Sequence, residues 1–309
     1  MKKLFVVCSV VLSVFQVQAQ NQFHLGQYAI HQPFINPASI GSFNEINMAL
    51  VYKNQWVGFE GAPQLGGFNY NMPLGKQQKN YIGLTGIMDK VGINSSTEIS
   101  GSYAYKIKTG DNSRLIFGMS ASLNLVKANL SEISTIDAND PLYSGNSPTF
   151  ALPNFKFGSY FFRKNFYVGF VVPNILENKV IEYNGSTKGE FSFNPANMHY
   201  YLHGGYRWRI KDKHDVIFSS LIKEVSGAPV QVDFNINTMF KDRFGLGISY
   251  RTSKEVMANI QMYVAPAFLV SYAYEYGFSA LNSFYSGTHE VMLVYRINSS
   301  NATIAFPRY

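Results

Sequence analysis

Two of the six histidines, His199 and His203, are four residues apart, a spacing that on a helix would suit two ligands of one metal ion. The residues around them alternate between polar and apolar, which indicates a strand. On a strand that rises ~3.3 Å per residue, the two side chains share a face but stand about 13 Å apart. They therefore cannot bind one metal ion, and we predict no metal site here.

A serine, a histidine and a carboxylate follow closely at Ser286, His289 and Glu290, which raises the question of a hydrolase. Hydrolysis of that kind needs the three side chains to converge. Adjacent strand residues point to opposite faces, so His289 and Glu290 should diverge. The sequence also lacks a phosphate-binding loop and a dinucleotide fingerprint, and its acidic residues are dispersed. We predict no enzymatic activity and no cofactor.

The N-terminus has the pattern of a secretory signal peptide over residues 1–19. Lys2 and Lys3 precede an apolar run over residues 4–15, and small residues at Val17 and Ala19 predict cleavage before Gln20. A membrane anchor is the alternative, but an apolar run of about twelve residues is too short to span ~30 Å of hydrocarbon. The single cysteine lies within the predicted signal, so the mature chain would have no disulfide.

The charge pattern argues against a nucleic-acid partner. The formal net charge of +7 falls to +5 without Lys2 and Lys3, because the predicted signal contains no acidic residue. A nucleic-acid-binding protein gathers its basic residues on one face. Here they are scattered, with small groups at 76–79 and 211–213 that we interpret as solvated turns.

The composition favours a membrane barrel. Aromatic residues make up 16% of the chain and charged residues only 15%, whereas soluble domains average ~25% charged residues. No stretch after residue 19 approaches the 18 apolar residues of a membrane helix. In a barrel, half of each strand faces lipid and half faces a polar interior, which explains both observations. We therefore predict an all-β fold, a transmembrane antiparallel β-barrel in the outer membrane of a Gram-negative bacterium.

A period of two residues runs through the chain, as in strands. Fourteen segments show it, most of them ten or more residues long, as a tilted membrane strand requires. An even number is expected for a closed bacterial barrel. The predicted strands are 44–54, 62–72, 80–90, 95–108, 113–127, 153–162, 165–173, 196–210, 214–224, 228–240, 242–251, 254–264, 266–276 and 288–297.

Connection lengths suggest an orientation. The three longest connections, 128–152, 174–195 and 277–287, all follow odd-numbered strands, whereas connections after even strands are mostly short. Periplasmic turns are short and extracellular loops long in such barrels, so we expect a periplasmic N-terminus. The barrel would span 44–297, with a pre-barrel segment over 20–43 and a tail over 298–309. The pre-barrel segment is expected to line the lumen or lie along the periplasmic rim.

Short motifs recur in order along the mature chain. The pre-barrel segment contains Gln27-Tyr28 and Asn36-Pro37-Ala38. The barrel contains Gln55-Trp56-Val57-Gly58, Gly61-Ala62-Pro63, Pro153-Asn154, Tyr167-Val168-Gly169, Val172-Pro173-Asn174, Gly227-Ala228-Pro229 with Gln231 and Asp233, and Ser286-Gly287-Thr288-His289-Glu290-Val291. Together they resemble the PorP/SprF family of type IX secretion system outer-membrane proteins from Bacteroidetes.

This resemblance implies a non-enzymatic role. Members of the family are associated with secretion or surface attachment of partner proteins, often large adhesins, and some with gliding motility. The implied partners are a secreted or surface protein that carries a type IX C-terminal domain, other type IX components and outer-membrane lipid.

The predicted topology places many motif residues at the extracellular rim. They either shape the loops, as Gly and Pro do in turns, or contact the partner. The candidate partner-binding residues are Trp56, Gly61, Ala62, Pro63, Pro153, Asn154, Pro173, Asn174, Gly227, Ala228, Pro229, Ser286, Gly287 and His289.

The alternative function is an outer-membrane porin or solute channel. A barrel of fourteen strands is wide enough for a lumen, and Arg207 and Arg209 on an inward face would favour anions. A barrel enzyme is the least supported interpretation.

Overall fold

A computed structural model describes residues 24–132, 147–183, 186–211, 214–278 and 283–297. The predicted signal peptide and C-terminal tail lie outside these residues. The strands are β1 (Ile46–Asn54), β2 (Gln64–Leu74), β3 (Asn80–Val91), β4 (Asn94–Gly110), β5 (Ser113–Ala128), β6 (Phe150–Arg163), β7 (Phe166–Val172), β8 (Leu176–Tyr183), β9 (Ser186–Phe193), β10 (His199–Lys211), β11 (His214–Val225), β12 (Gln231–Phe240), β13 (Phe244–Arg251), β14 (Glu255–Ala265), β15 (Phe268–Gly277) and β16 (Thr288–Ile297).

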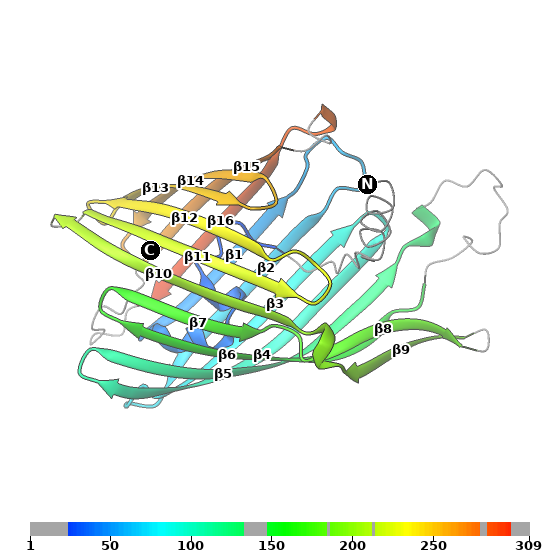
Figure 1. The fold of residues 1–309 in the computed structure, drawn as a ribbon, viewed down its shortest axis with the longest axis horizontal. Helices are drawn as coiled ribbons and strands as arrows, with labels where there is room; N and C mark the ends of the chain where they lie inside the picture. Colours follow the sequence, from blue (N-terminus) through cyan, green and yellow to red (C-terminus); the bar gives the residue numbers. More distant parts are fainter. Residues whose placement is uncertain (1–23, 133–146, 184–185, 212–213, 279–282, 298–309) are drawn as a thin grey trace, which may run out of the picture.

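Fourteen of these strands form one closed antiparallel barrel, β1 to β7 followed by β10 to β16 (Figure 1). The sheet closes where β1 pairs with β16, from Ile46 opposite Ile297 to Asn54 opposite His289. The predicted barrel of fourteen strands is therefore confirmed, with most strand ends within three residues of their expected positions.

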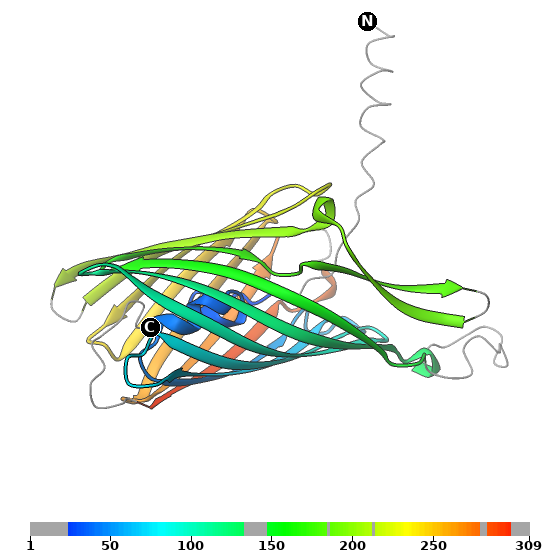
Figure 2. The ribbon, with the colours of Figure 1, turned by 90° about the horizontal axis from the view of Figure 1, so that it is seen from below.

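The two remaining strands are absent from the prediction. β8 and β9 form a separate hairpin within the connection 174–195, which we expected to be a loop. The hairpin projects from the same end as the long connections (Figures 1 and 2). We call this end of the barrel the long-loop end and the opposite end the short-turn end.

The outer face of the barrel is apolar and bears aromatic residues towards both ends. Tyr52, Tyr250 and Tyr276 are exposed on the outside near the long-loop end, and Tyr206 and Trp208 near the short-turn end. Aromatic belts of this kind lie at the two interfaces of a membrane barrel. None of the helices in the described part of the chain is long and apolar enough to cross a membrane.

Residues 24–43 lie inside the barrel, and we call them the plug. They include two short 3-10 helices, η1 (Gln32–Phe34) and η2 (Pro37–Ser42), drawn in blue within the barrel in Figure 2. Every residue from Leu25 to Phe43 is buried. Of the two positions expected for the pre-barrel segment, the structure has it in the lumen rather than along the rim.

The plug runs along the lumen from one end towards the other. The backbone carbonyl of His24 accepts a hydrogen bond of 3.2 Å from Lys53, near the long-loop end of β1. Towards the short-turn end, η2 packs against β4, β5 and β6. The first strand then begins at Ile46 and runs towards the long-loop end. The chain therefore passes through the lumen before it enters the barrel wall.

Candidate functional site

One carboxylate holds the first residues of the plug. Glu290 is almost fully buried on the inner face of β16, and its two carboxylate oxygens accept hydrogen bonds from the backbone amides of Gly26 (2.8 Å) and Gln27 (3.0 Å). The Gln27 side chain donates to the Glu290 carbonyl at 3.1 Å. Hydrogen bonds to a charged acceptor contribute about 1.5–3 kcal/mol each. Glu290 is therefore the main polar anchor of this part of the plug.

Ion pairs surround this anchor. Lys53 lies 3.7 Å from Glu275, and Arg251 lies 3.0 Å from Asp233 and 3.4 Å from Glu275. All four side chains are buried in the lumen. Buried charges are tolerated only when they are paired and hydrogen-bonded. The plug joins this network through His24, whose backbone carbonyl accepts from Lys53 and whose ring lies 3.6 Å from Asp233.

The second attachment of the plug is the turn at Asn36, Pro37 and Ala38. The Asn36 amide donates to the Ser159 carbonyl at 3.1 Å and to His203 at 2.9 Å, while its oxygen caps the amide of Ala38 at 2.9 Å. This turn fills a trough made by glycines on three adjacent strands: Gly118, Gly158 and Gly169.

The trough requires glycine. A Cβ on Gly118 would overlap the backbone of Ala38, and one on Gly158 would overlap the Asn36 side chain. The sequence motifs Gln27-Tyr28 and Asn36-Pro37-Ala38 thus serve to seat the plug, as does Glu290. This role was not predicted from the sequence, although glycines on the inner face of long strands are a signal of close backbone approach.

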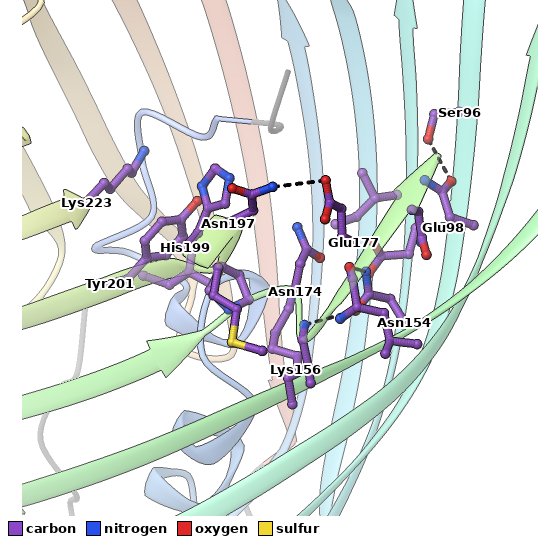
Figure 3. Close-up of a pocket in the computed structure, with 18 of the residues that line it drawn as sticks. Ser96, Glu98, Asn154, Lys156, Asn174, Glu177, Asn197, His199, Tyr201 and Lys223 are labelled. Carbon is purple, nitrogen blue, oxygen red and sulfur yellow. Dashed lines mark hydrogen bonds between the residues drawn. The ribbon is translucent and has the colours of Figure 1, made fainter. Parts of the chain in front are cut away.

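A cavity of about 410 Å³ opens above the plug at the long-loop end (Figure 3). Leu25, Phe34 and Ile35 of the plug form part of its lining, and we call it the mouth cavity. Its walls combine carboxamides with charges of both signs, among them Asn174, Glu98, Lys156 and Lys223. Three candidate residues from the sequence, Asn154, Pro173 and Asn174, line it.

Asn154 fixes the hairpin to the wall of the mouth cavity. Its side-chain oxygen accepts hydrogen bonds from the amides of Ile175 and Leu176, both at 3.0 Å, and its nitrogen donates to the Leu176 carbonyl at 2.9 Å. Pro153 contributes its carbonyl, which accepts from Asn178 at 3.2 Å. The Pro153-Asn154 motif therefore attaches β8 to β6.

Replacement of Asn154 by leucine should release the base of the hairpin. Leucine keeps the volume but removes the side-chain acceptor of the Ile175 and Leu176 amides, of which Ile175 keeps its bond to the Phe155 carbonyl. The loss should cost about 1–3 kcal/mol. We expect faster amide hydrogen exchange in β8 and β9 with unchanged exchange in the barrel strands. Asn174→Leu, which lines the same cavity without anchoring the hairpin, is the matched control. Equal protection of β8 in the Asn154 variant and the parent protein would contradict this role.

Glu177 joins β8 to the start of β10 on the other side of the cavity. Hydrogen bonds from Lys179, Asn194 and Asn197 lower the pKa of Glu177 to about 2. The carboxylate accepts from Asn194 at 2.9 Å and from Asn197 at 3.0 Å. A depressed pKa means that this contact stabilises the fold above the usual glutamate pKa of ~4.3.

We therefore expect the hairpin to stay ordered from neutral pH to about pH 5 and to loosen as the pH falls towards 2. Hydrogen exchange in β8 measured across this range tests the expectation. Glu177→Gln should show the loosened state already at neutral pH, whereas Glu190→Gln, an exposed change on β9, should not. A pH profile that is the same for Glu177→Gln and the parent protein would refute it.

A second cavity, of about 430 Å³, lies at the rim between the β1–β2 and β3–β4 connections. Trp56, Gly61 and Ala62 line it, so three more candidates share one site, which we call the rim cavity. Pro63 flanks it and accepts a hydrogen bond from the Gln55 amide at 2.9 Å. Trp56 has a φ of 51°, an unusual conformation for a bulky side chain.

The Ser286-Gly287 motif holds this conformation from the neighbouring connection. The amide of Val57 donates to the Gly287 carbonyl at 2.9 Å, and the amide of Ser286 donates to the Val57 carbonyl at 2.7 Å. The Trp56 ring lies 5.9 Å from the Tyr285 ring. The two motifs thus build one rigid part of the rim.

The other candidates lie apart from both cavities. Gly227, Ala228 and Pro229 form the β11–β12 connection, where Gly227 has a φ of 84° that suits a turn. His289 faces outwards, 2.7 Å from the Tyr272 hydroxyl, while Glu290 faces the lumen. The two side chains diverge as expected.

The remaining polar candidates face inwards. His199 and His203 both lie on the lumen face, as predicted. Arg209 lies 2.8 Å from Asp215, and Arg207 lies 3.9 Å from the same carboxylate, so their charge is partly neutralised. Within the described ranges, no group of three or more His, Cys, Asp or Glu side chains is arranged to hold a metal ion.

The family described as type IX secretion system membrane protein PorP/SprF matches residues 17–295. The chain belongs to this family. The resemblance inferred from the motifs is thus confirmed, and the barrel and the family together make this PorP/SprF protein an integral outer-membrane protein. A search of curated proteins found no match.

Several solved barrels are similar to this PorP/SprF protein in fold. The monoaromatic hydrocarbon channel CymD has 10% identity and a TM-score of 0.54, over 90% of this chain and 95% of that one. A deltaS2S3 mutant of the TodX monoaromatic hydrocarbon channel has 9% identity and a TM-score of 0.50, over 88% and 94% of the two chains. Acinetobacter baumannii Omp33 has 10% identity and a TM-score of 0.47, over 82% and 99%. At these identities the likeness to CymD and to the TodX mutant shows the fold alone.

Proposed function

We propose that this protein binds a secreted or surface partner of the type IX secretion system at its long-loop end, and so anchors the partner or helps to export it. The long-loop end is extracellular in this proposal, and the role is not enzymatic. The observation that carries it is the placement of the motif residues: those that do not seat the plug build the mouth cavity, the rim cavity and the connections around them.

The composition of this end supports a protein partner. Trp56 and Tyr285 form a rigid aromatic pair at the rim, and Phe59 and Phe284 beside them are 45% and 65% exposed. Aromatic residues are enriched at the energetic centres of protein interfaces. The mouth cavity adds polar and charged groups that would fix the orientation of a bound chain.

A solute channel is the second candidate function, because the two most similar folds reported above are hydrocarbon channels by their titles. The plug argues against an open pore. Residues 25–43 are buried inside the barrel and bonded to its wall through Glu290, Asn69, Asn235 and Ser159. A channel function would require the plug to move.

The proposal is tested by replacing residues 175–194, which contain the β8–β9 hairpin, with a short Gly-Ser turn. We expect the partner to be lost from mild-detergent pull-downs and from the cell surface, while the barrel keeps its heat-modifiable mobility on gels. The matched control changes the chain length by a similar number of residues at the other end, through an insertion into the β2–β3 turn at residues 75–78. Full partner retention on a folded barrel without the hairpin would contradict the proposal.

Single-channel recording separates the alternative function. We expect purified protein in planar bilayers to show no large, steady conductance. A steady conductance of that kind in the unaltered protein would favour the channel.

A further inference from the structure

The short-turn end of the barrel carries exposed cations. They occupy three of its connections, and the pairs are Lys76 and Lys79, Arg163 and Lys164, and Lys241 and Arg243. From the sequence, the lysine groups at 76–79 and 211–213 were predicted to be solvated turns. The group at 76–79 does lie in a turn, between β2 and β3, and the fold arranges this turn and two others in one ring.

The ring follows the perimeter of the barrel. The three pairs lie in the β2–β3, β6–β7 and β12–β13 connections, which are well separated in the closed strand order. Exposed cations therefore lie on several sides of the short-turn end and not on one face.

Few acidic groups oppose this charge. Among the described residues of the short-turn end, Asp111 and Asp242 are the exposed carboxylates. Asp111 lies 3.3 Å from Lys108, but both side chains are more than half exposed, and such pairs contribute little. At the long-loop end, by contrast, exposed Glu60, Glu190 and Glu224 offset the lysines. The positive charge of the protein is therefore concentrated at one end.

The depth of the ring identifies its ligand. It lies just beyond the outward-facing Tyr206 and Trp208, which are 50% and 56% exposed. Tyr and Trp side chains mark the level of the lipid headgroups. The ring therefore meets the membrane where phosphate groups lie, and each Lys or Arg near an anionic membrane surface contributes about as much binding as a twofold to tenfold change in affinity.

We propose that the ring of cations at the short-turn end binds the headgroups of anionic phospholipids in the adjacent leaflet. An acidic protein partner would meet one face of the barrel, whereas lipid surrounds it, and the cations are spread around the perimeter. The ring would keep a shell of anionic lipid around the barrel and fix its depth in the membrane. This inference is independent of the partner-binding proposal.

The two tryptophans of the chain provide the measurement. Trp208 faces outwards near the ring, and Trp56 lies at the other end. In Trp56→Phe protein, fluorescence reports on Trp208 alone. The protein is reconstituted in phosphatidylcholine vesicles with phosphatidylglycerol, and either lipid carries brominated chains that quench the tryptophan. The ratio of the two quenching curves gives the relative association constant for the anionic lipid.

We expect a preference of at least about threefold for phosphatidylglycerol, which falls towards one as salt is raised from about 0.05 to 0.5 M, because salt screens exposed charges. A variant of the ring should lose the preference at low salt. It combines Lys76→Gln, Lys79→Gln, Lys164→Gln and Arg243→Gln. The matched control removes the same charge from the long-loop end and should keep the preference for phosphatidylglycerol. Its substitutions are Lys90→Gln, Lys127→Gln, Lys188→Gln and Lys254→Gln. A relative association constant near one at low salt, in protein that keeps all the cations of the ring, would overturn the proposal. That result is expected if the ring binds an acidic protein and not lipid.

Discussion

Replacement of Glu290 by alanine should release the plug and produce a conductance that the parent protein lacks. The change removes the acceptor of the Gly26 and Gln27 amides and a carboxylate that interacts electrostatically with Lys53. A loss of about 3 kcal/mol from these charged hydrogen bonds would raise the released fraction roughly a hundredfold. Planar-bilayer recording of the purified variant measures this directly.

Two further variants make the Glu290 result specific. Glu290→Gln keeps an acceptor for one amide and should give a smaller conductance. Glu224→Ala removes an exposed carboxylate near the long-loop end of β11 and should give none. If Glu290→Ala showed no more conductance than Glu224→Ala, the Glu290 carboxylate would not be the anchor of the plug.

Valine at Gly118 should expel the turn that contains Asn36, Pro37 and Ala38. A Cβ at this position would overlap the backbone of Ala38, which cannot rotate away as a side chain can. Overpacking of this kind costs about 1–3 kcal/mol or more, and the plug is the part that can move. We expect residues 24–43 to become sensitive to protease while the barrel, in which valine suits a strand, stays folded.

Gly101→Val is the matched control, because Gly101 lies on the adjacent strand β4 with nothing within 4 Å of an added Cβ. It should leave protease resistance of the plug unchanged. Resistance that is also unchanged in Gly118→Val would show that the turn does not fill the glycine trough.

Sequence periodicity predicted the barrel well because each membrane strand must present apolar side chains to lipid on one face and polar side chains to the lumen on the other. Strand β16 alternates over all its ten residues and was predicted at its observed bounds, 288–297. The hairpin β8–β9 was missed because neither constraint acts on it. Its strands are eight residues each, they lie outside the barrel, and their side chains alternate less regularly, as in Lys188, Gly189 and Glu190.

The plug was predicted as a segment but not placed, because distant residues position it. Gly26 and Glu290 are 264 residues apart in the sequence, and no local pattern connects them. The alternation of β16 did indicate that Glu290 and His289 face opposite ways. It could not say that the lumen side would meet Gly26. Likewise, the sequence predicted that Asn154 lies at the rim, whereas its hydrogen bonds show that it attaches the hairpin to β6.

The plug affects both candidate functions, partner binding at the mouth and passage of a solute through the lumen. With residues 25–43 buried in the lumen, the mouth cavity has a floor made of Leu25, Phe34 and Ile35. A partner bound there would contact the plug directly. Partner binding at the mouth and passage through the lumen would therefore compete.

The central claim, that this protein works at its long-loop mouth with the plug in place, is tested most directly by partner retention when the plug is locked. A Cβ on Gly26 would lie 2.5 Å from the Met257 sulfur, so positions 26 and 257 face each other, and loss of free thiols verifies the disulfide between cysteines placed there. We predict that cells with the oxidised Gly26→Cys, Met257→Cys protein keep the partner on their surface at the parental level. Loss of the partner that is reversed by a reductant would contradict the claim, because it would show that the plug must leave the lumen.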